Sequence, residues 1–444
     1  MDLIAFIHDL TWDALPTRVQ KQARRCLVDT IGVALSGRQT ELSRIISSHV
    51  REVYAGQGSR LWLDGREVSK PGAALANGTS IDSLDMHDGH PTTKGHAGAA
   101  VLPALFAALP VRGPTGISGQ DFCAALVVGY EVALRAGIAL HATSVDYHSS
   151  GAWNALGCAA VCARIFELTR EQTRHALGIA EYHGPRSQMM RCIDHPTMLK
   201  DGSGWGAMTG VSAAMLAKSG FTGAPALTVE DHAVREIWST LGKAWEMDHL
   251  YFKPHAVCRW GQPAIEAIIQ LQAKHCIVPQ EVFTVAVSTF HQAVCLAGSQ
   301  PETTEQAQYS IAYPLAAVMF TGLLGYKELC GVSLHNPDIC SLASRVAVEE
   351  DSELSACFPE QRWARVRVTM QDGRVLDSGS VQARWDADEP PSDEDLLQKF
   401  RNLVREMIES QQAEELEKAV WQCAESEDVQ TLRDMISLIP GDRM

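Results

Sequence analysis

Residues 85–103 read DMHDGHPTTKGHAGAAVLP, and acid–base side chains crowd the first twelve of these positions. They are Asp85, His87, Asp88, His90, Lys94 and His96. The flanking segments, PGAALANGTSIDSL before and AGAAVLPALFAALPV after, are small and apolar, which is typical of buried helices. Polar groups held between buried helices are costly unless they are paired or used. We therefore interpret the segment as a functional loop and not as a solvated surface turn.

The chain has 444 residues, enough for two domains if a domain takes about 150 residues. Hydrophobic residues make up 46% and charged residues 20%, an ordinary balance for a globular enzyme. The formal net charge of -15 argues against a nucleic-acid partner and against an anionic membrane surface. An anionic substrate would therefore need positive charge concentrated at its site.

Cysteine usage and the N-terminus bear on the compartment. The twelve cysteines include no CxxC pair, and the N-terminus lacks the basic region and cleavage site of a secretory signal. We therefore expect a reducing, cytoplasmic environment. No apolar run reaches about 18 residues without charged or turn residues, so the sequence predicts no transmembrane helix.

The first half of the chain has helical periodicity almost throughout. Residues 1–37 predict two helices, and a small hairpin with its turn at Asp64-Gly65 follows a third. From residue 69 to about 221, short Ala-rich helices alternate with Gly or Pro. Such small residues let helices pack face to face. The sequence therefore predicts a large all-α domain over residues 1–248.

The pattern changes near residue 249. The run VFTVAVSTF alternates like a strand, and WARVRVTMQDGRVLDSGSV contains two alternating runs joined by Gln371-Asp372-Gly373, which predicts a hairpin. Together with the helix predicted for CRWGQPAIEAIIQLQAKH, these strands favour a second, α+β domain over residues 249–391. Amphipathic helices return after residue 391, so residues 392–444 should complete the first domain. The expected fold class is mainly α, with one large helical domain and one smaller α+β domain.

Further polar residues lie at predicted helix ends and at the domain junction. His148 and Lys200 precede helices, Tyr313 lies in an apolar run, and Lys253 and Arg259 belong to FKPHAVCRW at the junction. Each of these alone is usually structural. Together they supply cations that bind carboxylates and groups that move a proton, which suits a small anion with several carboxylates.

Three interpretations of the central loop compete. Its aspartates and histidines could bind a metal, and the adjacent His87-Asp88 is similar to HD-type phosphohydrolases, although no HExxH helix is present. Metal-free acid–base chemistry, in which Asp and His tune each other, is the second. A purely structural network is the third. No GxSxG elbow, P-loop or dinucleotide fingerprint follows a suitable strand.

Four segments in order carry a resemblance to a known family. They are LVDTIGVALSG, NGTSIDSLDMHDGH with KGHAGAAVLPAL, LKDGSGWGAMTG, and FKPHAVCRWGQPAIEA. This order resembles the MmgE/PrpD family over nearly the whole chain. The family includes 2-methylcitrate dehydratase, cis-aconitate decarboxylase and iminodisuccinate epimerase. The resemblance implies a helical domain built from both chain ends, a smaller α+β lid domain and a homodimer. It also implies an interdomain site that works without a metal or an organic cofactor.

The resemblance also implies which residues form the site. Asp85 and His96 match the family's first Asp and its downstream His. Further site positions are matched by His148, Lys200, Lys253 and Tyr313. The chain departs from the family where it reads His87-Asp88-Gly89 instead of Asp-Asp-Thr, and where it adds His90 and Lys94. Cys258 falls where the decarboxylases carry a His, which weakens the assignment as a decarboxylase.

We therefore expect an enzyme that abstracts a proton alpha to a carboxylate of a small polycarboxylate. A hydro-lyase like 2-methylcitrate dehydratase comes first and an iminodisuccinate-type epimerase second. A cis-aconitate-type decarboxylase, a metal-dependent hydrolase and a non-catalytic family member are further alternatives. The expected catalytic residues are Asp85, His96, His148, Lys94 and Tyr313. The expected substrate-binding residues are His87, Asp88, His90, Lys200, Lys253 and Arg259, and no residue is expected to bind a metal.

Overall fold

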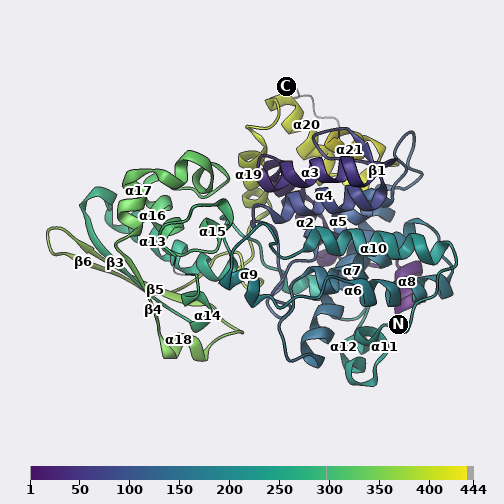
Figure 1. Ribbon diagram of the computed structural model, residues 1–444, viewed down its shortest axis with the longest axis horizontal. Coiled ribbons are helices and arrows are strands. Elements are labelled where there is room, and N and C mark those ends of the chain that lie inside the picture. The colour runs from purple at the N-terminus through teal and green to yellow at the C-terminus, as the bar shows by residue number, and fades with distance from the viewer. Residues whose placement is uncertain (1, 297, 438–444) are drawn as a thin grey trace.

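A computed structural model describes residues 2–296 and 298–437 of the chain. Figure 1 shows a helical body, which contains the N-terminus, and a part beside it that carries a sheet. The last helices of the chain, coloured yellow, return to the helical body. The predicted fold class, mainly helical with a small sheet in the C-terminal region, is confirmed.

The helical body follows the predicted succession of short helices. Its longer helices are α1 (Leu3–Asp9), α2 (Thr17–Gly37), α3 (Glu41–Val53), α4 (Lys70–Asp82), α5 (Gly98–Ala108), α6 (Gly119–Thr143), α7 (Gly151–Ile165), α8 (Arg170–His183) and α10 (Ser203–Lys218). Its shorter helices are α9 (Met190–Asp194), α11 (Leu227–Glu230) and α12 (Arg235–Ser239). The predicted hairpin is formed by β1 (Ala55–Arg60) and β2 (Glu67–Val68), which pair antiparallel.

Small residues let α7 lie close to its neighbours α6 and α10. A Cβ atom at Gly157 would lie 2.5 Å from the Gly129 carbonyl oxygen on α6. A Cβ atom at Gly210 on α10 would lie 2.3 Å from the Cys158 Cβ. Both distances are far below van der Waals contact, so the glycines set the helix spacing that the Ala- and Gly-rich sequence predicted.

Helix α6, which contains Glu131 and Arg135, is the segment on which the expectation of no transmembrane helix bears most directly. Among the described residues it is the one helix that qualifies by length and composition, and 94% of its most apolar window is buried inside the protein. Its apolar surface is therefore covered by other helices, which is the environment of a core helix.

The sheet has the strand order β4-β3-β5-β6. Its strands are β3 (Val282–Thr289), β4 (Val346–Glu350), β5 (Trp363–Met370) and β6 (Val375–Gln382). Strand β3 and the β5–β6 hairpin were predicted, and Gly373 takes a φ of +84° in the hairpin turn. Strand β4 was not predicted, and it pairs parallel to β3. The longer helices of this sheet-bearing part are α13 (Gln262–His275), α16 (Ala312–Thr321) and α17 (Pro337–Ala343), and its shorter helices are α14 (His291–Val294), α15 (Thr304–Gln308) and α18 (Ser352–Ala356).

The chain returns to the helical body through α19 (Asp393–Val404), α20 (Ser410–Trp421) and α21 (Gln430–Ser437). A capping box between Ser392 and Asp395 begins α19, which packs against α2. The predicted domain boundaries, 1–248 with 392–444 and 249–391, stay a prediction. Residues 438–444 at the end of the predicted returning segment lie outside the described residues.

Candidate active site

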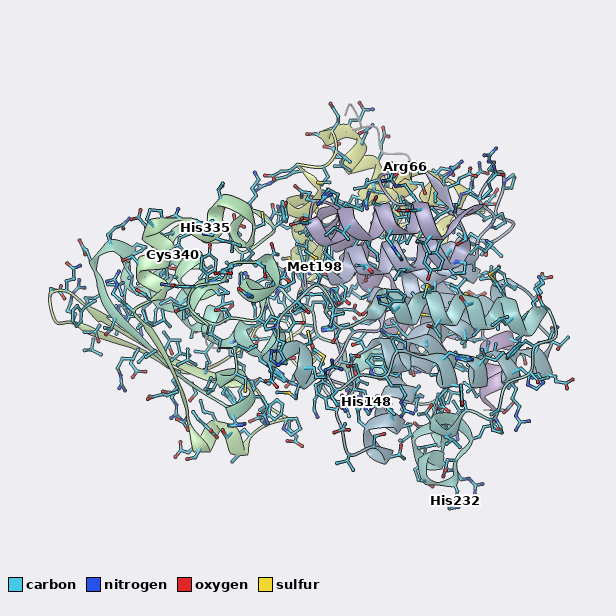
Figure 2. All side chains as sticks on the ribbon, in the orientation of Figure 1. Arg66, His148, Met198, His232, His335 and Cys340 are labelled. Atoms are coloured by element: carbon cyan, nitrogen blue, oxygen red, sulfur yellow. The ribbon has the colours of Figure 1, made fainter. Side chains whose placement is uncertain are left out.

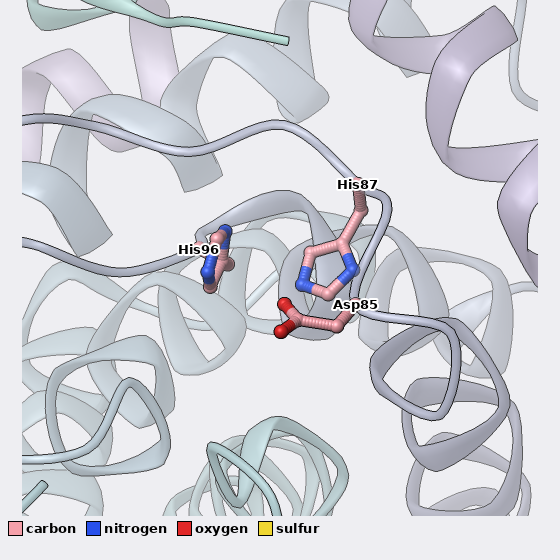
Figure 3. Close-up of side chains that lie close together, drawn as sticks. All are labelled: Asp85, His87 and His96. Atoms are coloured by element: carbon pink, nitrogen blue, oxygen red, sulfur yellow. The ribbon is translucent and has the colours of Figure 1, made fainter. Parts of the chain in front are cut away.

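The loop between α4 and α5 is withdrawn from water, although it is rich in acids and histidines. His87 and Asp88 are 0% exposed, and His96, with 8%, is the most exposed of the buried loop histidines. Asp85, His87 and His96 point toward one another (Figure 3), and the two imidazole ring centroids lie 4.4 Å apart. Asp85 also has a φ of +52°, which is strained for a residue with a side chain. The loop is therefore held in an unfavourable conformation that brings polar groups together in the interior.

A buried ion pair joins this loop to the segment that leads into the sheet-bearing part. The Lys253 Nζ donates to Asp85 Oδ1 over 2.5 Å, and neither residue is more than 4% exposed. Burial alone would raise the pKa of Asp85, but the charges of Lys253 and Lys200 outweigh it and leave the pKa below its usual value. Asp85 is therefore a carboxylate at neutral pH.

His96 has one ring nitrogen fixed and the other available. Its Nδ1 lies 2.6 Å from the Asp88 carbonyl oxygen, which can only accept, so Nδ1 carries the proton. Burial and, next, the charge of Lys253 lower the pKa of His96 to about 3. His96 is therefore neutral at pH 7, and its Nε2 has a free lone pair that can accept a proton.

Two carboxyl groups lie behind the histidine pair. The Asp201 Oδ2 lies 3.8 Å from His96 Nε2, and the Asp82 Oδ1 lies 3.8 Å from His87 Nε2. Burial raises the pKa of Asp82 to about 6, and burial together with the Asp82 carboxyl raises the pKa of Asp201 to about 7. Each of these groups can therefore gain or lose a proton near neutral pH.

His87 and Asp88 have different environments within the same loop. Burial and the neighbouring His96 lower the pKa of His87 far below its usual value, and neither ring nitrogen has a hydrogen-bond partner among the described residues. Burial raises the pKa of Asp88 to about 7, and its carboxyl interacts with Tyr130 and Cys26. Asp88 therefore acts on the site through its carbonyl group, which orients His96.

A small cavity lies beside His96, between the helical body and the sheet-bearing part. Its lining residues are Asp85, Lys94, His96, Tyr147, Met189, Ile193, Tyr251, Cys258, Arg259, Trp260, Tyr309 and Arg362. Its volume of about 30 Å³ is room for one or two water molecules. Ligand pockets usually have about 300–1,000 Å³, so this cavity, with its lining as it stands, is closed to a polycarboxylate.

Positive charge gathers around the cavity, although the whole chain is acidic. Lys94, Arg259 and Arg362 line it, and Lys253 lies behind Asp85. Lys200 is 4% exposed, donates to Gln308 Oε1 over 2.5 Å, and lies 4.7 Å from the centre of the Tyr309 ring. Such a set of cations suits an anion with more than one carboxylate.

Two family models match the chain over most of its length. The model for the MmgE/PrpD N-terminal domain matches residues 1–243, and the model for the MmgE/PrpD C-terminal domain matches residues 255–425. The chain belongs to the MmgE/PrpD family. It is therefore a family enzyme, and the family acts on small carboxylic acids.

Curated relatives of this MmgE/PrpD protein are distant but match over nearly the full length. A cis-aconitate decarboxylase of Homo sapiens is 27% identical, over 97% of this chain and 92% of that protein. A cis-aconitate decarboxylase of Aspergillus terreus is 23% identical, over 98% of this chain and 95% of that protein. The cis-aconitate decarboxylase-like protein oryM of Aspergillus oryzae is 24% identical, over 98% and 96%. These similarities leave the specific reaction of this family member open.

Seven residues that the sequence assigned to the site do not line the cavity: His87, Asp88, His90, His148, Lys200, Lys253 and Tyr313. Of these, His87, Asp88, Lys200 and Lys253 lie in the buried polar surroundings described above, and the other three have partners elsewhere. His148 is half-buried on the helical body (Figure 2), and its Nδ1 lies 2.8 Å from the Asp146 carbonyl oxygen. The Tyr313 hydroxyl donates to the Ser333 carbonyl oxygen over 2.6 Å. The His90 Nε2 lies 3.5 Å from Glu246 Oε2. Each of these three side chains already has a polar partner elsewhere, so we assign none of the three to substrate in this MmgE/PrpD protein.

Several residues that line the cavity or lie next to His96 were missed by the sequence analysis. Asp201 follows Lys200 directly, but an isolated Asp beside a Lys gives no signal of a role. Tyr251 lies in the segment between the two predicted domains, where no pattern singled it out. Its backbone pairs with Gly89: the Gly89 N–H donates to the Tyr251 carbonyl oxygen over 3.0 Å, and the Tyr251 N–H donates to the Gly89 carbonyl oxygen over 2.9 Å. A Cβ at Gly89 would lie 2.5 Å from the Tyr251 ring, so glycine at this departure from the family pattern permits the close approach. Arg362 precedes a predicted strand, where a lone Arg is usually exposed.

Asp85, His87 and His96 also have the composition of a metal site. One ligand atom from each lies within 4.8 Å of the others (Figure 3), and a carboxylate with two imidazoles suits a transition metal. The Lys253 ammonium, however, already contacts the same carboxylate over 2.5 Å. A metal ion bound here would have to share Asp85 with this cation or displace it.

Proposed function

We propose that this MmgE/PrpD enzyme abstracts a proton alpha to a carboxylate of a small polycarboxylate, without a metal or an organic cofactor. The observation that carries the proposal is the state of His96. Its Nδ1–H is fixed on the Asp88 carbonyl oxygen, and its neutral Nε2 is free in a cavity lined by cations. A base that is neutral at working pH and held in place is what proton abstraction requires.

In this mechanism the His96 Nε2 takes the proton and becomes part of an imidazolium. The Asp85 carboxylate raises the pKa of His96 against the effect of burial, and so favours that charged state. Negative charge that develops on the substrate carboxylate is stabilised by the surrounding Lys and Arg side chains. The water-poor surroundings strengthen both interactions.

Two tyrosine hydroxyls could give a proton to the leaving group of the substrate. Tyr251 and Tyr309 both line the cavity, and burial raises the pKa of each. Both hydroxyls therefore keep their proton at neutral pH. One of them can protonate a departing hydroxide, which is the step that separates a hydro-lyase from the other family reactions.

We place a hydro-lyase like 2-methylcitrate dehydratase first among the possible outcomes. Cys258 lines the cavity where the resemblance expects a His in decarboxylases, and burial raises the pKa of its thiol to about 12. This neutral thiol cannot supply the charge of an imidazolium. The similarity to cis-aconitate decarboxylases favours decarboxylation of cis-aconitate as the second candidate, and epimerisation is the third.

The test is proton NMR in D2O with chelator-treated protein and four substrates: 2-methylcitrate, citrate, cis-aconitate and iminodisuccinate. We expect deuterium uptake or product formation that is lost in His96→Gln. The matched control is His148→Gln, because His148 lies outside the cavity, and it should retain the activity. No exchange with any substrate, or equal activity in H96Q, would contradict the proposal.

The group of Asp85, His87 and His96 favours one different function, that of a metal-dependent hydrolase. Metal analysis of the purified protein separates the two functions. Stoichiometric metal that is lost in His87→Gln, with activity restored only by added metal, would favour the hydrolase. Full proton-exchange activity after chelation would exclude it.

A further inference from the structure

Arg362 is a buried cation that forms no direct ion pair among the described residues, although the charge of the more distant Asp386 acts on it. It is 6% exposed and lines the cavity. One guanidinium nitrogen donates to the Pro91 carbonyl oxygen over 3.2 Å, and its Nε has no hydrogen-bond partner. By contrast, the neighbouring Arg259 forms an ion pair with Asp386 at 2.6 Å. A buried charge without a counter-charge is costly, so its retention calls for an anion.

Lys94 adds a second unneutralised charge to the same cavity. Its side chain is half-buried, lies 5.0 Å from the centre of the Tyr147 ring, and has no ion-pair partner in the described part of the chain. Its backbone has a φ of +50°, and the Tyr147 hydroxyl donates to its carbonyl oxygen. Burial and the charge of Arg362 both lower the pKa of Lys94, and the Glu360 carboxylate, which forms no ion pair with it, opposes them only in part. Lys94 therefore has a strained backbone and an ammonium group near the Arg362 cation. An anion that binds between the two cations would explain both features.

The other cations at the cavity already have partners. Lys253 is paired with Asp85, Arg259 with Asp386, and Lys200 donates to Gln308. Among the described residues, Lys94 and Arg362 are therefore the cavity cations that form no ion pair and can take an incoming anion as their counter-charge. A guanidinium offers two parallel donors that match a carboxylate, and an ammonium adds a third.

We propose that Arg362 and Lys94 form a subsite that binds one carboxylate of the substrate. This proposal rests on the proposed function and deepens it, because it names a substrate with a second carboxylate besides the one next to the abstracted proton. Lys94 is thereby a binding residue and not a catalytic base. Because Arg362 lies just before β5 and Lys94 lies in the helical body, the bound carboxylate also joins the two parts of the molecule.

The experiment measures binding of two unreactive probes, tricarballylate and sulfate, by isothermal titration calorimetry. We expect Arg362→Gln and Lys94→Gln each to weaken binding of tricarballylate at least tenfold and to reduce binding of sulfate. Arg367→Gln is the matched control, because Arg367 is exposed on β5 and paired with Asp377, and it should bind both probes like the wild type. Arg362→Lys should restore part of the affinity.

The thermal stability of the ligand-free variants separates binding from structure. Removal of an unneutralised buried cation should leave the Tm of R362Q equal to or above that of the wild type, whereas a structural arginine would lower it. Unchanged binding of both probes by folded R362Q would overturn the subsite, and so would a lower Tm with unchanged probe affinity.

The outcomes also separate the subsite from the proposed function. If sulfate binding depends on Arg362 but no polycarboxylate exchanges a proton, the subsite stands and the proposed function fails. If proton exchange depends on His96 but R362Q binds tricarballylate like the wild type, the proposed function stands and the subsite fails.

Discussion

At the scale of single residues, the pKa of His96 decides at which pH the base is available. Burial and Lys253 lower this pKa to about 3, so the ring stays neutral when the pH falls below its ordinary pKa. Because Asp201 beside His96 has a pKa of about 7, we make the prediction for Asp201→Asn: its kcat/KM for proton exchange should keep no acid limb between pH 5 and 7. The rate of deuterium uptake by this variant, measured from pH 4 to pH 8, checks this. An acid limb with a midpoint of 6 to 7 that persists in D201N and is absent from a buffer control would mean that His96 is not the base.

Asp201, which lies 3.8 Å from His96, makes the stability of the protein depend on pH. Its folded pKa of about 7 lies above its unfolded value of about 3.9, so the folded state binds the extra proton. This contribution to stability is complete below about pH 4 and is lost as the pH rises through about 7. We predict that Asp201→Asn gains Tm relative to the wild type between pH 5 and pH 8, while its turnover falls because the Asp201 carboxyl lies 3.8 Å from His96 Nε2.

Glu131 provides the control for Asp201. Burial raises its pKa to about 7 as well, but it pairs with Arg135 and lies outside the cavity. Glu131→Gln should therefore show the same pH trend in Tm and retain turnover under conditions in which it is folded. A D201N variant whose Tm difference from the wild type is constant with pH would contradict the raised pKa.

Residue-level patterns could predict some of the site but not all of it. The loop aspartate and histidine and Lys253 meet where the resemblance implied. Tyr313 does not, because α15 (Thr304–Gln308) ends before it and α16 begins at Ala312. A break between two helices rotates Tyr313 away from Tyr309, which lines the cavity instead. No periodicity across such a break tells which of two tyrosines, four residues apart, faces the substrate.

At the scale of elements, one buried ion pair anchors the returning helix α19. The Lys399 Nζ donates to Asp29 Oδ1 on α2 over 2.5 Å and to the Met86 carbonyl oxygen of the central loop over 2.7 Å. Loss of one partner of a buried pair typically costs about 3–5 kcal/mol. We predict that Lys399→Met lowers the free energy of unfolding in urea by this amount, and that Asp29→Asn combined with it restores most of the loss.

Arg401 on the same helix is the matched control for Lys399. It pairs with Glu417 and Glu394 at the surface, where ion pairs contribute about 0–1 kcal/mol. Arg401→Gln should therefore change the free energy of unfolding by less than about 1 kcal/mol. Equal losses in K399M and R401Q would show that the anchor is not the Lys399–Asp29 pair.

Element prediction succeeded where local signals were strong. The turn at Gln371-Asp372-Gly373 determines the β5–β6 hairpin, and the alternation of VFTVAVSTF determines β3. Strand β4 was missed because VAVEE has only five residues and ends in two glutamates, a residue type that is depleted in strands. Its place in the sheet comes from parallel pairing with β3, about sixty residues earlier in the chain, and such long-range pairing leaves no local signal.

At the scale of the whole molecule, the site exists only because distant segments meet. The cavity combines the loop at 85–96 with Tyr147, the segment 251–260, Tyr309 and Arg362. Family resemblance could indicate that a site lies between the two parts. It could not predict that Arg362 lines the cavity. Whether a residue just before β5 reaches the cavity depends on how the sheet-bearing part sits against the helical body (Figure 1).

The closed cavity makes a prediction about the whole molecule. About 30 Å³ cannot admit a tricarboxylate, so the two parts must separate before binding and close again afterwards. Trp260 lines the cavity and reports on its occupancy. In stopped-flow fluorescence with tricarballylate, we predict an observed binding rate that saturates with ligand concentration, because opening becomes limiting. Trp260→Phe should remove most of the signal and identify its source. A rate that instead rises linearly to the highest concentration would show that the entrance is already open, and the closed form described above would then be a minor state.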